Sequence, residues 1–176
     1  DAARQGLRAV LREAIKDRIS VFAGVQVNPG RLMTEGDGIF AAVYPKAIPF
    51  PMDGFSSRTG NGATDAATIA RALFGGDVND AWLAVQLVRL QNRVRSLLVN
   101  AWGLLATDGK LKATADNVKI RNVLSSLEQA HRDSPQRTLG EDLALLLRPP
   151  YGGNLASASI LLGLFVGKVL PPRAMY

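Results

Sequence analysis

The sequence contains no cysteine and a single histidine, and only 6% of its residues are aromatic. Without cysteine, the chain has no disulfide, no thiolate metal ligand and no thiol nucleophile. With His131 as the only histidine, a histidine metal cluster is excluded, and a serine triad would depend on this one residue. We expect His131 to be solvated, because it ends a polar helix beside Arg132 and Asp133. The sequence therefore predicts no catalytic residue, no metal and no cofactor.

Long apolar runs are lacking as well. A helix that crosses a bilayer needs about 20 apolar residues, whereas the run from Leu155 to Gly167 is shorter and includes Ser157 and Ser159. We expect no signal peptide, because Asp1 to Arg18 carries charges throughout. We therefore predict a cytoplasmic protein with no membrane partner. Because the sequence begins without Met, we also expect it to be a segment of a longer protein.

Two glycine-rich stretches resemble nucleotide-binding loops, but neither has the required spacing. Gly163, Gly167 and Lys168 are one residue short of a Walker A sequence and lie late in an apolar stretch. We predict that these two glycines let another helix approach closely. In TGNGATDAA, Asp65 stands where the third glycine of a dinucleotide fingerprint would fall, so an ordinary loop is favoured over an anion site.

Basic residues exceed acidic ones, which gives a formal net charge of +6. Clustered Lys and Arg would favour a nucleic acid, since they bind phosphates and release counterions. The cations are scattered along the sequence, however, and an ordinary solvated surface remains the alternative. If DNA or RNA is bound, we expect nonspecific backbone contacts from seven residues: Arg89, Arg93, Arg95, Lys110, Lys112, Lys119 and Arg121.

Apolar residues recur every three or four positions over most of the chain, which predicts amphipathic helices. The predicted helices are 2–22, a shorter one within 31–44 interrupted by Gly36 and Gly38, 64 or 65 to 74, 77–106 as one helix or a pair, 115–131, 139–147 and 154–169.

Capping and turn residues bound several of these segments. Thr64 or Asp65 is expected to cap the helix that ends at Phe74, and Asn154 is expected to cap the last helix. Three prolines within 44–55 predict an extended segment, pinned by Phe50 and Phe55.

Core anchors and short strands are also expected in the middle of the chain. Trp82 and Trp102 are predicted to anchor the 77–106 region in the core. A strand from Leu97 is the alternative there, and Leu111 with Lys112 would start a short pairing strand.

These patterns predict a mainly α fold, a helical domain that ends in a winged-helix or helix-turn-helix-like unit with at most a short β-hairpin. We divide it into residues 1–76, helical and rich in proline and glycine, and residues 77–176, with one continuous domain as the alternative. Burial of the apolar helix at 154–169 is central to this prediction, because burying each large side chain contributes about 1.5 to 3 kcal/mol.

The stretch LLLRPPYGGNLASASILLGLF, within residues 139–170, resembles the PPYG-containing winged-helix segment of very large P-loop ATPases of bacterial phage-defence islands, the BREX ATPase type. The residues that carry the resemblance are Pro149, Pro150, Tyr151 and Gly152. It implies a non-catalytic domain of a larger bacterial ATPase-type protein, with other domains or subunits as partners. The alternative is a small enzyme or ligand-binding domain with a pocket between Glu35 and Asp65, where the acidic residues Glu35, Asp37 and Asp53 lie.

Overall fold

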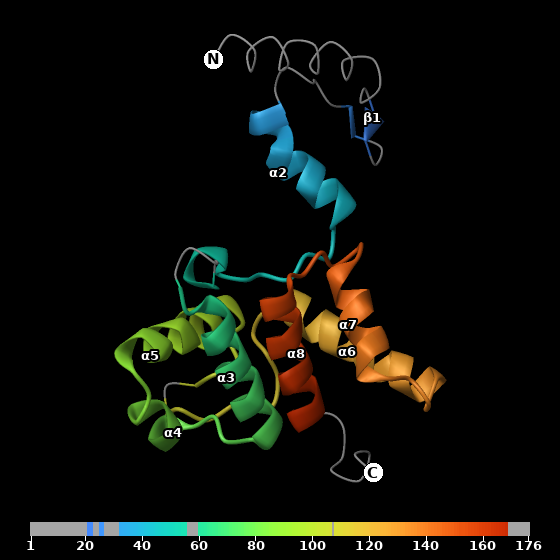
Figure 1. Cartoon of the computed structure of the whole chain (residues 1–176). Coiled ribbons are helices and arrows are strands. Elements are labelled where there is room, and N and C mark those ends of the chain that lie inside the picture. Colours follow the sequence, from blue (N-terminus) through green and yellow to red (C-terminus); the bar gives the residue numbers. More distant parts are fainter. Residues whose placement is uncertain (1–20, 23–24, 27–31, 56–59, 107, 169–176) are drawn as a thin grey trace. The chain divides into compact units, whose positions relative to one another are not determined.

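A computed structural model describes residues 21–22, 25–26, 32–55, 60–106 and 108–168. The chain divides into two compact units, residues 1–45 and 46–176, so the boundary predicted after residue 76 falls inside the second unit. The described part is mainly helical, as predicted (Figure 1). Within it, no helix has both the length and the apolar composition needed to cross a membrane.

The first unit contains a small strand pair and one helix. Strand β1 (Val21–Phe22) pairs antiparallel with β2 (Val25–Gln26). The predicted helix 2–22 lies outside the described residues except for Val21 and Phe22, where strand pairing shows the helix prediction to be wrong.

Helix α2 (Leu32–Val43) runs through both of its glycines without interruption, which corrects the predicted break. A glycine inside a helix costs only about 0.5–1 kcal/mol relative to alanine, which is too little to end a helix by itself. Near its C-terminal end, Phe40 packs against Tyr44, the residue that follows the helix, with ring centroids 4.9 Å apart.

The second unit opens with the proline-rich segment, which is extended up to the 3₁₀ helix η2 (Met52–Phe55). Phe55 is buried and its ring lies 4.8 Å from that of Phe50, which confirms both as anchors. Trp102 is fully buried and its indole Nε1 donates to the Pro49 carbonyl at 2.6 Å, which fastens the extended segment to the core. Trp82 packs against the same core, partly buried.

Helix α3 (Gly62–Gly75) follows, and then a series of short helices: α4 (Asp80–Ala84), α5 (Val88–Val94) and the π-helix η4 (Arg95–Ala101). The predicted 77–106 region is thus a broken helical run, and the strand suggested from Leu97 is absent from it. Leu105 and Leu111 form an isolated antiparallel bridge across the following turn, as expected for a short pairing.

The last three helices are α6 (Val118–Asp133), α7 (Leu139–Leu147) and α8 (Leu155–Lys168). Asn154 caps α8 as predicted, accepting from the Ser157 amide at 2.8 Å. Between α7 and α8, the Tyr151 and Gly152 amides both donate to the Arg148 carbonyl at 3.0 Å, and Gly152 has a φ of 57°. The PPYG residues therefore form a tight turn, with Tyr151 buried at its base.

Helix α8 is interior, as predicted, and packs along α3 (Figure 1). Leu161, Leu164 and Phe165 have no exposed surface. A Cβ atom at Gly163 would overlap the carbonyl oxygen of Ala70, and one at Gly167 would overlap that of Leu73. These two contacts confirm the prediction of close helix approach. Gly163 lies against Ala70 and Gly167 lies against Leu73, so the residue numbers increase in the same direction along α3 and α8. The two helices are therefore parallel.

Candidate functional site

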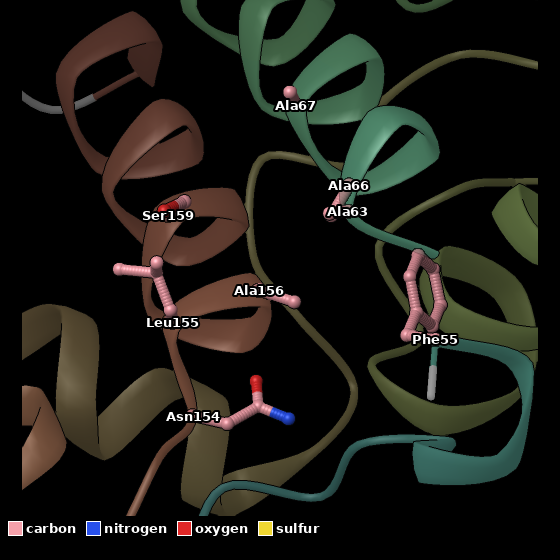
Figure 2. Close-up of a pocket in the computed structure, with 8 residues that line it drawn as sticks. All are labelled: Phe55, Ala63, Ala66, Ala67, Asn154, Leu155, Ala156 and Ser159. Carbon is pink, nitrogen blue, oxygen red and sulfur yellow. The ribbon is translucent and has the colours of Figure 1, made fainter. Parts of the chain in front are cut away.

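A groove lies where the first turns of α3 and α8 separate. Its volume is about 430 Å³. Figure 2 shows α8 on one side of it and α3 with the Phe55 ring on the other. It is lined by eight residues: Phe55, Ala63, Ala66, Ala67, Asn154, Leu155, Ala156 and Ser159.

The groove follows from the sequence of the two helices. Their C-terminal halves touch through Gly163 and Gly167, where no side chain keeps the backbones apart. In their N-terminal halves most of the residues that line the groove are alanines of both helices and Ser159, whose small side chains leave the space between the helices open. Gly62 allows the start of α3 to lie against the Phe55 backbone, since a Cβ at Gly62 would lie 2.5 Å from the Phe55 carbonyl oxygen.

The lining chemistry is apolar and unsuited to acid–base catalysis. Leu155, at the lip, is 63% exposed. None of the eight lining residues is ionisable, and their polar groups are the Asn154 amide and the Ser159 hydroxyl. The groove can therefore accept an apolar side chain or helix, but it offers no nucleophile paired with a base.

Near Phe55, the buried carboxylate of Asp65 binds two of the arginines that were predicted to contact nucleic acid. The Arg89 guanidinium donates to both oxygens of Asp65, at 3.0 and 3.1 Å, and Arg93 donates to the same carboxylate. Arg93 also lies over the Phe55 ring, 5.6 Å from its centroid. Burial alone would raise the pKa of Asp65, but the hydrogen bonds from Arg89 and Arg93 lower it below its ordinary value.

This cluster corrects one prediction and qualifies another. Neither Thr64 nor Asp65 caps α3: the helix begins at Gly62, and the Asp65 carboxylate is bound by the arginines. Arg93 is only 8% exposed, so its guanidinium is not accessible to a phosphate. Arg89 keeps a side chain that is 42% exposed.

The other predicted cations lie on several elements. Arg95 on η4 and Lys119 on α6 are exposed. The Lys110 side chain is 81% exposed and lies 3.9 Å from the Asp108 carboxylate. Lys112 is paired with Asp116 at 2.5 Å, and Arg121 donates to the carbonyls of Ala115 and Asp116 at 2.7 and 2.8 Å.

The histidine prediction was wrong. His131 Nε2 lies 2.6 Å from the Asp142 carboxylate, which is fully buried and also accepts from Arg137 Nε at 2.5 Å. The ring packs 5.4 Å from that of Phe165. This cluster joins the end of α6 to α7 and α8, and the one signal for it in the sequence is a lone aspartate among the leucines of α7.

The acidic residues of the Glu35 to Asp65 region do not form a described site. Asp37 is exposed on α2. The side chains of Glu35 and Asp53 lie outside the described part of the structure. Among the described residues, no group of three or more His, Cys, Asp or Glu side chains could hold a metal ion.

Comparison with protein-family models, curated proteins and solved structures finds no match to this chain, so its own geometry is the basis for a functional proposal.

Proposed function

We propose that residues 46–168 form a non-catalytic interaction module of a larger, cytoplasmic bacterial ATPase of the phage-defence type. The module would receive an apolar element of another domain or subunit of that protein in the groove between α3 and α8. The observation that carries this proposal is the groove itself, which has an apolar lining, the exposed Leu155 at its edge and no ionisable group among its lining residues. An exposed leucine beside a row of alanines is suited to receiving a packed side chain.

The last three helices support the family part of the proposal. Helices α6, α7 and α8 are consecutive, and α7 packs against α8. The turn at Pro149–Gly152 separates α7 from α8, and the Lys46 amide donates to the Pro150 carbonyl at 3.0 Å. In our proposal α6–α8 is the helix-turn-helix-like part of a winged-helix unit. Because α8 is buried along most of its length, its role there is packing and not base readout.

Crosslinking tests the groove in the intact protein. A photoreactive phenylalanine analogue would replace Leu155 in the full-length protein, expressed in its own cells, with Val118 as the matched control. Val118 is 55% exposed and lies on α6, outside the groove. We expect the Leu155 probe to crosslink to one defined segment of the same protein or of its subunits. Equal crosslinking from both positions, or products with unrelated proteins only, would refute the proposal.

Nonspecific contact with a nucleic-acid backbone is a second candidate function. It is favoured by the exposed ammonium groups of Lys110 and Lys119, which are not buried in ion pairs as Arg93 is. A gel shift with duplex DNA and single-stranded RNA at rising salt would test it. Affinity should fall with salt, and Lys110→Gln with Lys119→Gln should reduce the salt dependence by about two counterions. The double variant Lys46→Gln with Arg132→Gln is the control for net charge. If the control weakens binding equally, the effect is general and these two lysines are not a site.

A further inference from the structure

A second hollow lies between α4, η4 and the turn that the Leu105–Leu111 bridge closes, and it shares no lining residue with the groove. Its volume is about 350 Å³. The lining residues are Asp80, Leu83, Arg95, Val99, Asn100, Leu105, Ala106 and Gly109. Unlike the groove, this pocket combines an apolar base with two opposite charges at its edge. The buried base includes Leu83 and Leu105, which are 6% and 5% exposed.

In the part of the chain that the structure describes, neither of the two charges is taken up by an ion pair, although Asp80 also lies in the first turn of α4. Asp80 and Arg95 are both exposed and, among the described residues, neither has an ion-pair partner. They do not pair with each other, although they border the same pocket. In this respect Arg95 differs from Arg89 and Arg93, whose guanidinium groups are held by Asp65.

The π-helix brings the polar side chains to the pocket. In a π-helix, hydrogen bonds join residues five apart, so residues i, i+4 and i+5 lie close to the same side. Arg95, Val99 and Asn100 have this spacing, and all three line the pocket. Such wide turns occur frequently at functional sites.

Asp80 is positioned by contact with the turn. Gly109 has a φ of 72°, and a Cβ atom there would overlap the Asp80 carboxylate. The absence of a side chain at Gly109 therefore lets the carboxylate lie against the backbone at the edge of the pocket. Any other residue at this position would displace the carboxylate and strain the turn.

We propose that this pocket binds a free α-amino acid with an apolar side chain. The Arg95 guanidinium would receive the carboxylate, whose geometry matches its paired donors. Asp80 would receive the ammonium group, and the Asn100 amide can donate to the carboxylate or accept from the ammonium group. The side chain would lie on Leu83, Val99 and Leu105. A volume near 350 Å³ is at the small end of ligand pockets, as a small zwitterion requires. This proposal is independent of the groove and of the proposed packing function.

Calorimetric titration of the whole chain with L-leucine and L-valine tests the assignment. We expect binding of both, and at least tenfold weaker binding of leucinamide, N-acetyl-leucine and L-aspartate. Each analogue lacks one of the two charges or the apolar side chain, and a hydrogen bond to a charged group contributes enough to account for about a tenfold change.

Variants locate the site. Arg95→Gln and Asp80→Asn should each weaken L-leucine binding about tenfold or more, while Arg132→Gln, at an exposed cation outside the pocket, leaves it unchanged. Gly109→Ala should also weaken binding, and circular dichroism verifies that each variant is folded. No heat with any of the amino acids, or equal affinity for leucine and leucinamide, would overturn the proposal. The proposal would also be overturned if Arg95→Gln weakened DNA binding but left L-leucine binding unchanged. In that case the Arg95 guanidinium would bind phosphates and not the carboxylate of an amino acid.

Discussion

The close contact of α8 with α3 predicts that Gly163→Ala destabilises the protein, although alanine favours a helix more than glycine does. Alanine in place of glycine gains about 0.5–1 kcal/mol from helix propensity and the unfolded chain. At Gly163, however, the new methyl would overlap the Ala70 carbonyl oxygen. Since that oxygen belongs to the backbone of α3, the helices must move apart, and overpacking of this kind costs about 1–3 kcal/mol.

Subtracting the gain from the cost gives a net loss of up to about 2.5 kcal/mol for Gly163→Ala, and the overlap of the added Cβ with a backbone oxygen favours the upper half of that range. In a chain of this size, each kcal/mol lowers Tm by about 2–4 °C. The matched control is Gly140→Ala in α7, where the closest atom to the added Cβ is the Thr138 hydroxyl oxygen at 3.8 Å. This control adds no overlap, so we expect unchanged stability or a gain of up to about 1 kcal/mol.

Urea unfolding measures both variants through the fluorescence of the two tryptophans, of which Trp102 is fully buried. The free energy of unfolding should fall for Gly163→Ala with an unchanged dependence on urea, because the unfolded state exposes the same surface. If Gly163→Ala were as stable as the wild type, or gained stability as Gly140→Ala does, the close approach of α3 and α8 would be refuted.

Three further predictions concern the core, the buried carboxylate and a helix cap. Leu161→Asp should unfold the second unit, because it would place an unpaired charge in the core. Leu155→Asp, at the exposed edge of the groove, should stay folded. If circular dichroism showed cooperative unfolding and wild-type stability for Leu161→Asp, this prediction would be wrong. Asp65→Asn should cost about 3 kcal/mol, because Arg93 would remain buried without a counter-charge. Because the pKa of Asp65 is lowered in the folded state, its carboxylate stabilises the fold above the pKa of the unfolded chain, and this stabilisation is lost as pH falls through the folded-state pKa. In acid titrations the free energy of unfolding should therefore fall more for the wild type than for Asp65→Asn. Parallel titration curves for the two proteins would count against the ion pair. Thr138→Ala should cost about 1 kcal/mol in thermal unfolding, since Thr138 forms a capping box at the start of α7, and an unchanged Tm would show that this cap is not stabilising.

The sequence predicted elements best where local signals bound them. Helix α7 has the predicted limits, since the Ser134–Pro135 turn precedes it and Pro149 follows it. Helix α8 begins one residue later than predicted and continues to Lys168, the last residue that the structure describes, and its burial followed from its composition. The close approach of another helix to Gly163 and Gly167 was also expected, although the sequence did not indicate that this helix is α3. These features depend on neighbouring residues, so their signal is present within a short window.

Features that depend on distant residues were missed. Asp65 is suited to a cap by its position, but arginines 24 and 28 residues away take its carboxylate. His131 has polar neighbours in sequence, yet it packs under Phe165 and binds Asp142. The groove combines Phe55 and the start of α3 with the start of α8, some 90 positions later in the numbering. No periodicity in either helix indicates which partner it faces.

The pairing of α3 with α8 also has a consequence for how the protein is made. Helix α3 covers its apolar face with a helix that is synthesised long after it, so contacts of high sequence separation must form before the core closes. A nascent chain that has not yet reached Leu155 would present the uncovered side of α3 to its surroundings. Chaperone binding during translation should therefore be strongest in the interval between the synthesis of these two helices and should end once α8 has emerged.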